Sequence, residues 1–170
     1  MPSGAIPVRF ALGFDVFVEK DLMISQENLE CNKSYTFDTS QPRDVNGNYW
    51  QAEIVETPWH KMHRYKCMVE RVYDGDTITR AVVDLGFNTT IIAKFRLYGI
   101  NAPELKGKTL EAARRSRDRL IGLVLDKEVL IETRSDQKEK YGRHLATVIV
   151  DGINVNHLLV DEGFAVPYMV

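Results

Sequence analysis

The sequence predicts a mainly β domain with two helices, arranged as a five-stranded barrel of the OB-fold type and preceded by a β-rich extension. Strand-like runs at residues 65–73, 77–85 and 89–100 come first, a helical segment follows, and two more strand-like runs come after it. Five strands with a helix between the third and the fourth suit a closed or partly closed barrel. The 170 residues allow one domain, or a compact domain with an appendage.

The composition is that of an ordinary globular protein, with 44% hydrophobic and 27% charged residues. The 22 Lys and Arg against 24 Asp and Glu give a net charge of −2. This charge argues against a polycation that coats nucleic acid, but it leaves a local phosphate-binding site open. Residues 1–64 carry 6 basic and 9 acidic side chains, whereas residues 65–170 carry 16 and 15, so the acidic excess lies in the extension.

The two cysteines, Cys31 and Cys67, show no C-x-x-C spacing. We therefore expect free thiols in a reducing compartment rather than a disulfide framework or a thiolate zinc site. The first 20 residues lack the pattern of a signal peptide, and no apolar run approaches the roughly 20 residues that span a bilayer. The sequence predicts a cytoplasmic protein with no signal peptide and no membrane anchor.

Residues 1–64 form the extension, with short β-type runs at 7–10 and 49–55. The sequence does not indicate its role: it adds strands that cover the barrel, or it offers a surface to a protein partner. His60 and His63 suggest a metal pair, but no other ligand lies nearby in the sequence, so a surface role is favoured.

The first three runs of the barrel are rich in Val, Ile, Thr and Tyr, which is typical of strands. Residues 86–88 read as a hairpin connection between the second and third runs, so the three strands are predicted to form an antiparallel meander. Two further strands are predicted at 128–133 and 144–150, separated by a polar loop over 134–143.

A helix is predicted from Thr109, its expected cap, to about Asp126, with Glu111 in its first turn. Its apolar face comprises Leu110, Ala113, Leu120, Ile121 and Val124, with Arg117 on the same face. A shorter helix is predicted over 154–162 and ends at Gly163.

The longer helix also carries a cluster of arginines: Arg114, Arg115, Arg117 and Arg119. A solvated helix face is the favoured interpretation of this cluster, and a contact with a nucleic-acid backbone is the alternative.

Three separated polar clusters occupy the ends of predicted strands. They are Asp74-Gly75-Asp76-Thr77, then Arg96 followed by Asn101-Ala102-Pro103-Glu104, then Lys140-Tyr141-Gly142-Arg143. Each pattern alone is common in turns and loops. Together, and in this order, they resemble the staphylococcal nuclease family of calcium-dependent phosphodiesterases.

The resemblance covers roughly residues 65–168 and extends to residues 95–104, 140–146 and 155–163 within that span. It implies an OB-fold barrel and a nuclease that cuts DNA and RNA, prefers single strands and leaves 3′-phosphates. The run 96–104 is also similar to nuclease-like proteins of tailed bacteriophages, which makes a bacteriophage origin an expectation.

Phosphodiester hydrolysis needs a positioned water, a carboxylate that takes its proton, and positive charge where oxygens become negative. A hard cation held by oxygen ligands adds to that charge. The resemblance implies that Asp76, Asn101 and the backbone carbonyl of Ala102 bind calcium. It also implies that Glu104 contacts the water of the metal ion and activates it, while Asp74 orients a metal-bound water.

The resemblance assigns two arginines, Arg96 and Arg143, to the scissile phosphate. Their planar forks can hold two phosphate oxygens at once and bind more strongly as charge builds. Lys140 and Tyr141 match family residues that contact a terminal nucleotide phosphate.

Asn101 stands where the family has an aspartate. It keeps an oxygen ligand but removes a negative charge, so the sequence predicts weak calcium binding or use of another divalent cation.

Two other functions stay open: a catalytically inactive module of the same fold that binds nucleic acid or a protein, and a bacteriophage assembly protein that works through its extension. The presence of Asp76, Arg96, Glu104 and Arg143 favours the enzyme.

Overall fold

The computed structural model describes residues 5–14, 16–23, 35–36, 49–50, 55–56, 63–106, 109–138 and 142–168. The chain divides into two compact units. One comprises residues 1–62 together with 85–89, and the other comprises residues 63–84 and 90–170. The predictions for Cys31, His60, Lys140 and Tyr141 lie outside the described residues.

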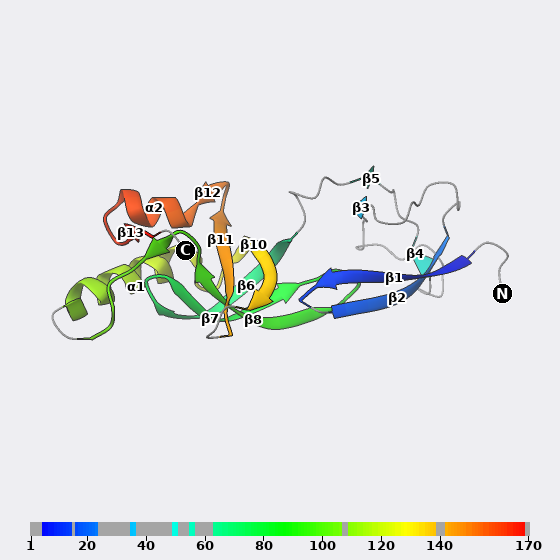
Figure 1. The fold of residues 1–170 in the computed structure, drawn as a ribbon, viewed down its shortest axis with the longest axis horizontal. Coiled ribbons are helices and arrows are strands. Elements are labelled where there is room, and N and C mark those ends of the chain that lie inside the picture. The colour runs from blue at the N-terminus through cyan, green and yellow to red at the C-terminus, as the bar shows by residue number, and fades with distance from the viewer. Residues whose placement is uncertain are drawn as a thin grey trace. The chain divides into compact units, whose positions relative to one another are not determined.

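The first unit is β-rich where it is described (Figure 1). Strands β1 (Ala5–Gly13) and β2 (Val16–Met23) form an antiparallel pair, and β4 (Tyr49–Trp50) runs parallel to β2. Strands β3 (Tyr35–Thr36) and β5 (Val55–Glu56) form a separate antiparallel pair. The β-rich character predicted for the extension is confirmed.

The second unit is a closed five-stranded barrel. Its strands are β6 (Arg64–Asp74), β7 (Thr77–Asp84), β8 (Thr90–Leu97), β10 (Glu128–Lys138) and β11 (His144–Val150). They follow the order β10-β6-β7-β8-β11, and a further pairing of β10 with β11 closes the barrel. Only β8 and β11 pair in parallel within it. The predicted OB-type barrel and its antiparallel meander are confirmed.

Two strand boundaries differ from the sequence prediction. The third predicted strand is broken at Gly99, whose φ of +78° starts a turn, and the chain resumes as β9 (Ile100–Asn101). Strand β10 continues to Lys138, so the loop predicted from residue 134 was wrong over its first five residues. The reason is backbone pairing, because Lys138 lies opposite His144 and the two strands remain together beyond the apolar run.

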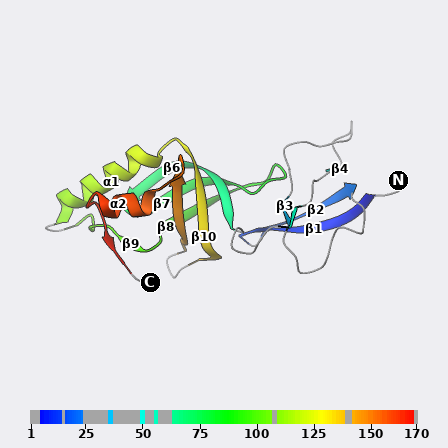
Figure 2. The same ribbon diagram turned by 90° about the horizontal axis from the view of Figure 1, so that it is seen from above.

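Two helices lie side by side at one end of the barrel (Figures 1 and 2): α1 (Leu110–Val124) and α2 (Val155–Asp161). The short β12 (Ile153–Asn154) leads into α2, and β13 (Val166–Pro167) pairs with β9.

The caps of the two helices differ. Asn154 caps α2, because its side chain accepts a hydrogen bond from the backbone of His157 at 3.1 Å. Thr109 occupies the cap position of α1 but makes no capping bond. Its hydroxyl instead donates to the carbonyls of Glu104 and Lys106, so the capping role expected for Thr109 was wrong.

The buried face of α1 is narrower than predicted, because Leu110, Arg117 and Ile121, which were placed on it, are only partly buried. The buried residues are Ala113, Ser116, Leu120 and Val124. Ser116 therefore takes the place in the core that Arg117 seemed to occupy. Within the predicted arginine cluster, Arg117 pairs with Asp118 and Arg119 pairs with Glu162, so these two are engaged within the protein.

The barrel interior and the helices form one apolar core. Its fully buried large side chains include Val69, Ile78, Val83, Phe95, Leu97, Leu120, Ile131, Val148 and Leu159. Cys67 belongs to the same core as a free thiol, as expected, and burial raises its pKa to about 12. In the part of the chain that the structure describes, no helix is long and apolar enough to cross a membrane.

Candidate active site

The site begins at the tight turn between β6 and β7, where residues 74–77 carry two carboxylates. The Asp74 side chain accepts a hydrogen bond from the backbone N–H of Asp76 at 3.2 Å. Such an Asx-type bond holds a turn without help from other strands. The turn therefore fixes the position of Asp76 at the entrance to β7.

Gly75 in this turn packs directly against α1. A Cβ at this position would lie 1.9 Å from Ser116 Oγ and 2.8 Å from Ala102 Cβ. Only glycine fits such a close approach. The contact docks the carboxylate turn on the helix and sets the depth at which Asp76 enters the protein.

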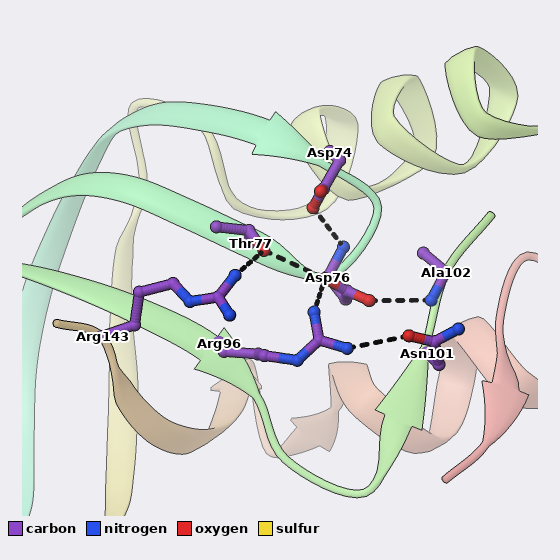
Figure 3. A network of polar contacts seen from close by, with 7 residues as sticks. All are labelled: Asp74, Asp76, Thr77, Arg96, Asn101, Ala102 and Arg143. Atoms are coloured by element: carbon purple, nitrogen blue, oxygen red, sulfur yellow. Dashed lines mark hydrogen bonds and ion pairs between the residues drawn. The ribbon is translucent and has the colours of Figure 1, made fainter. Parts of the chain in front are cut away.

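Asp76 is almost completely buried, with 2% of its surface exposed. Its Oδ1 accepts hydrogen bonds from Thr77 Oγ1 at 3.0 Å and from Arg96 Nη1, and its Oδ2 accepts one from the backbone N–H of Ala102 at 2.8 Å. A buried carboxylate is stable when it is paired and hydrogen-bonded in this manner. Asp76 is thus the centre of the polar network in Figure 3.

Arg96 reaches the network from the end of β8, where its backbone lies opposite Thr77 of β7. Its Nη1 donates to Asp76 Oδ1, and its Nη2 donates to Asn101 Oδ1 at 2.9 Å. One guanidinium therefore bridges both side chains that were predicted to bind calcium. Because 19% of the Arg96 side chain stays exposed, it also faces solvent.

Arg143 is the residue that immediately precedes β11. The parallel pairing of His144 with Phe95 brings the start of β11 beside the end of β8. Arg143 Nη1 donates to Thr77 Oγ1 at 3.2 Å, and Figure 3 shows both guanidinium groups directed at the turn that carries Asp76. The two arginines, 47 positions apart in the sequence, thus contact neighbouring residues, Arg96 at Asp76 and Arg143 at Thr77.

The second carboxylate of the turn, Asp74, has a raised pKa. Burial is the main cause, and repulsion from the nearby Asp76 carboxylate adds to it. Hydrogen bonds from the Asp76 backbone and Thr77 oppose the shift without reversing it. Burial and the neighbouring carboxylate thus both disfavour the ionised form of Asp74.

Glu104 lies apart from this network. Its side chain is 72% exposed, and its Oε2 lies 3.7 Å from the ammonium of Lys106. Among the residues that the structure describes, no hydrogen bond or ion pair joins the Glu104 carboxylate to Asp76, Arg96 or Arg143. The structure brings together Asp76, Arg96, Asn101, Ala102 and Arg143 and leaves Glu104 at the rim.

The oxygen atoms of the site suit a hard cation in type and direction. Asp76 Oδ1 and Asn101 Oδ1 both accept from one guanidinium, so they converge on a common positive charge. Carboxylate and amide oxygens are ligands that Ca²⁺ accepts. Within the described residues there is no group of three or more His, Cys, Asp or Glu side chains that could hold a metal. The oxygen ligands at this site thus suit a cation that is held by one buried carboxylate, that of Asp76, together with an amide oxygen.

Thr77 and Ser116 are two residues at the site whose contacts the sequence did not indicate. Thr77 connects Arg143 to Asp76, and Ser116 receives the turn through Gly75. The Asp-Gly-Asp-Thr motif contained a signal for Thr77, since a hydroxyl next to a buried carboxylate is a natural donor to it. Ser116 had only a weak signal, a small residue at a core position of a helix.

At the rim of this small OB-type barrel lie a buried carboxylate and two arginines, a residue type whose planar guanidinium can bind a phosphate through two hydrogen bonds. Comparison with known proteins identifies the class further. Residues 94–170 match the family model described as staphylococcal nuclease homologue. Over these residues, a little under half of the chain, the protein is therefore similar to staphylococcal nuclease homologues.

The chain is also similar to two curated proteins that are named as endonucleases. Endonuclease YhcR of Bacillus subtilis is 33% identical over 116 residues, which cover 62% of this chain and 9% of that protein. An uncharacterized endonuclease of Haemophilus influenzae is 34% identical over 102 residues, which cover 60% of this chain and 52% of that protein. The chain thus spans about half the length of one relative and less than a tenth of the other.

Proposed function

We propose that this protein is a metal-dependent nuclease that hydrolyses phosphodiester bonds in DNA and RNA at the Asp76 network. The observation that carries the proposal is that Arg96 donates to the buried Asp76 carboxylate while Arg143 donates to the hydroxyl of the adjacent Thr77. The family of the domain and the names of the two relatives, both endonucleases, support the reaction class.

Arg96 and Arg143 are the groups that bind the scissile phosphate. Both are rooted in the barrel wall, and the carboxylate and hydroxyl that they contact restrict the directions their forks can take. A positioned guanidinium gains binding energy as the phosphate oxygens become more negative in the transition state. The two arginines therefore stabilise the reaction rather than only the bound substrate.

Asp76, Asn101 and the backbone carbonyl of Ala102 are the proposed calcium ligands. Calcium at this place would supply positive charge to the phosphate and to an attacking water. Arg96 occupies the side-chain oxygens of Asp76 and Asn101 in the structure, so the ligands must give up bonds to its guanidinium when they hold the ion. This competition and the missing charge at Asn101 both favour weak binding.

Glu104 is the proposed base that takes a proton from the attacking water. It lies three residues after Asn101 and its exposed carboxylate is free of the core. Catalytic contacts of this kind often tighten only when substrate is bound. Lys140 and Tyr141 are proposed to contact a terminal phosphate, and single strands are the proposed preferred substrate.

The test is cleavage of an end-labelled single-stranded DNA by the wild type, Glu104→Gln and Arg143→Ala. Each protein is assayed in calcium, in magnesium and in chelator. We expect cleavage by the wild type in calcium, its loss in chelator, and a drop of about 100-fold or more in each variant.

Three results contradict the proposal in different ways. Cleavage in chelator would contradict the proposed metal dependence. Full activity of both variants would contradict the roles assigned to Glu104 and Arg143. Binding of the DNA without cleavage under every condition would support the inactive binding module instead. The exposed position of Glu104 is the observation that makes this second function worth testing.

A further inference from the structure

We propose that Thr77 is a positioning residue, whose hydroxyl couples Arg143 to the Asp76 carboxylate and so sets the direction of the Arg143 fork. The inference rests on the proposed function of the Asp76 network. It concerns a residue to which no role was assigned from the sequence.

The Thr77 hydroxyl contacts Arg143 and both carboxylates of the turn, since it also forms a hydrogen bond with Asp74. Its Oγ1 lies 3.0 Å from Asp76 Oδ1 and 3.2 Å from Arg143 Nη1. A hydroxyl has one hydrogen to donate, whereas a guanidinium can only donate and a carboxylate can only accept. The polarity is therefore fixed: Arg143 donates to Thr77, and Thr77 donates its hydrogen to the carboxylates of the turn, of which Asp76 lies at 3.0 Å.

This fixed polarity makes the two bonds depend on each other. A hydroxyl that donates to a carboxylate becomes a better acceptor, because successive hydrogen bonds polarise one another at low dielectric. Thr77 is buried, with 3% of its surface exposed, so water does not compete readily for either bond. The negative charge of Asp76 thus acts on Arg143 through the hydroxyl of Thr77.

The backbone of Thr77 is held from both sides. It lies opposite Asp74 on β6 and opposite Arg96 on β8. A β-branched side chain has restricted χ1 freedom, so a fixed backbone also fixes the hydroxyl. Thr77 therefore offers Arg143 a rigid acceptor next to the place where Arg96 binds Asp76, as Figure 3 shows.

The two arginines are therefore both positioned relative to the same carboxylate oxygen, Asp76 Oδ1. Arg96 reaches Asp76 Oδ1 directly, and Arg143 reaches the same oxygen through Thr77. Two forks that bind one phosphate must keep a defined separation and orientation, and small misplacement of catalytic groups is costly. Thr77 is the group that keeps this separation on the Arg143 side.

The experiment compares Thr77→Val with Thr77→Ser in the full chain. Valine has nearly the shape of threonine but lacks the hydroxyl, whereas serine retains it. Cleavage of a labelled single-stranded DNA in saturating calcium is measured over a range of DNA concentrations. We expect Thr77→Val to lower kcat by about 10- to 100-fold with a change in KM below about threefold, and Thr77→Ser to restore most of the loss.

Thr79→Val is the matched control. Thr79 lies two residues further along β7, and its hydroxyl donates a hydrogen bond to the Arg71 carbonyl at 3.5 Å, away from Asp76 and Arg143. The substitution is chemically the same and lies in the same strand. Near wild-type kcat in Thr79→Val, together with a loss in Thr77→Val, assigns the effect to the hydroxyl of Thr77.

Arg143→Ala provides the decisive background. If Thr77 acts through Arg143, Thr77→Val lowers kcat by less than about threefold when Arg143 is already absent. An equal loss in both backgrounds would overturn the proposal, and so would a Thr77→Val enzyme with wild-type kcat.

Chemical unfolding of the wild type, Thr77→Val, Arg143→Ala and the double variant gives a readout that needs no activity. If Thr77 couples Arg143 to Asp76, the change in unfolding free energy caused by Thr77→Val should be at least about threefold smaller when Arg143 is already alanine. Additive changes in unfolding free energy for the two substitutions would overturn this coupling. If the wild type does not cleave DNA, the proposed function fails, and this unfolding cycle still decides whether Thr77 positions Arg143.

Discussion

At the scale of residues, the protein concentrates its polar chemistry around a single buried carboxylate. Asp76 accepts from two side chains and one backbone N–H, and one of its partners, Arg96, also holds Asn101. The network leaves little of the Asp76 charge unpaired. Its properties should therefore respond strongly to changes at the neighbouring positions.

Asn101→Asp tests the origin of weak metal binding. The added carboxylate attracts a doubly charged ion more strongly than the singly charged guanidinium of Arg96, so calcium affinity should rise by about tenfold or more. Isothermal titration with calcium measures the change. Asn154→Asp is the control, because it adds the same charge at the cap of α2 and an aspartate serves equally as a cap. Equal affinity in Asn101→Asp and the wild type would contradict this account.

Gly75→Ala tests the contact between the carboxylate turn and α1. The new Cβ would meet Ser116 Oγ at 1.9 Å, so we expect a loss of about 1–3 kcal/mol in the free energy of unfolding. Gly122→Ala is the matched control, because nothing lies within 4 Å of that position and alanine favours a helix by about 1 kcal/mol. Denaturant unfolding should show opposite signs for the two variants, and a stable Gly75→Ala protein would refute the close approach.

The sequence indicated Asp76, Arg96, Asn101 and Arg143 from their motif order, and the structure brings them together, while their catalytic and metal-binding roles stay predictions. It could not identify Thr77 or Ser116, because the roles of these residues depend on contacts between strands and a helix that lie 40 residues apart or more. The roles assigned to Glu104, Lys140 and Tyr141 stay predictions.

At the scale of elements, the helices hold the end of the barrel that carries the site. Arg119 of α1 donates two hydrogen bonds to Glu162, which follows α2, at 2.6 and 2.7 Å. These bonds from Arg119 hold the pKa of Glu162 below its ordinary value. A two-point contact of this kind fixes the geometry of the pair better than a single ion pair.

Glu162→Gln tests this link between the helices. Because its pKa is lowered on folding, Glu162 stabilises the protein above its unfolded pKa near 4.5, and this contribution is lost as the pH falls through the lower folded pKa. The wild type should therefore be more stable than Glu162→Gln at pH 7, and the difference should shrink below pH 4.5. Unfolding measured from pH 7 to pH 3 checks the trend.

The control for this prediction is the same substitution in Arg119→Gln, where it should change little. A difference between wild type and Glu162→Gln that stays constant down to pH 3 would contradict the linkage.

Sequence patterns predicted most elements because each has a local cause. Strand-forming residues marked the meander, and Asn154 marked the start of α2. The extra length of β10 had no local signal, since it depends on pairing with β11. The role of Thr109 was wrong for a similar reason: its hydroxyl found acceptors in the preceding loop instead of the helix.

At the scale of the whole molecule, barrel closure brings the three motifs together. The parallel pairing of β8 with β11 places the residue before β11 next to the end of β8, and the meander places β7 on the other side. The site therefore exists only in the closed barrel. The roles of the residues before 63, the bacteriophage origin and the cytoplasmic location stay predictions.

Cys67 reports on the integrity of the barrel. Its thiol is buried and its pKa of about 12 leaves very little thiolate at pH 8. In a Cys31→Ser protein, a thiol reagent should therefore label Cys67 only as fast as the barrel opens, and adding denaturant should accelerate labelling greatly. Rapid labelling of the native protein would contradict the closed core.

The central claim is that the arginines around Asp76 are a phosphodiester-hydrolysing centre. Its most direct test is cleavage of single-stranded DNA in calcium by Arg96→Lys beside Arg80→Lys, an exposed arginine of β7 that pairs with Glu70 at 2.5 Å. Lysine preserves the charge but not the fork. We predict a loss of about 100-fold or more in Arg96→Lys and near wild-type cleavage in Arg80→Lys. Equal cleavage by the two variants would contradict the account.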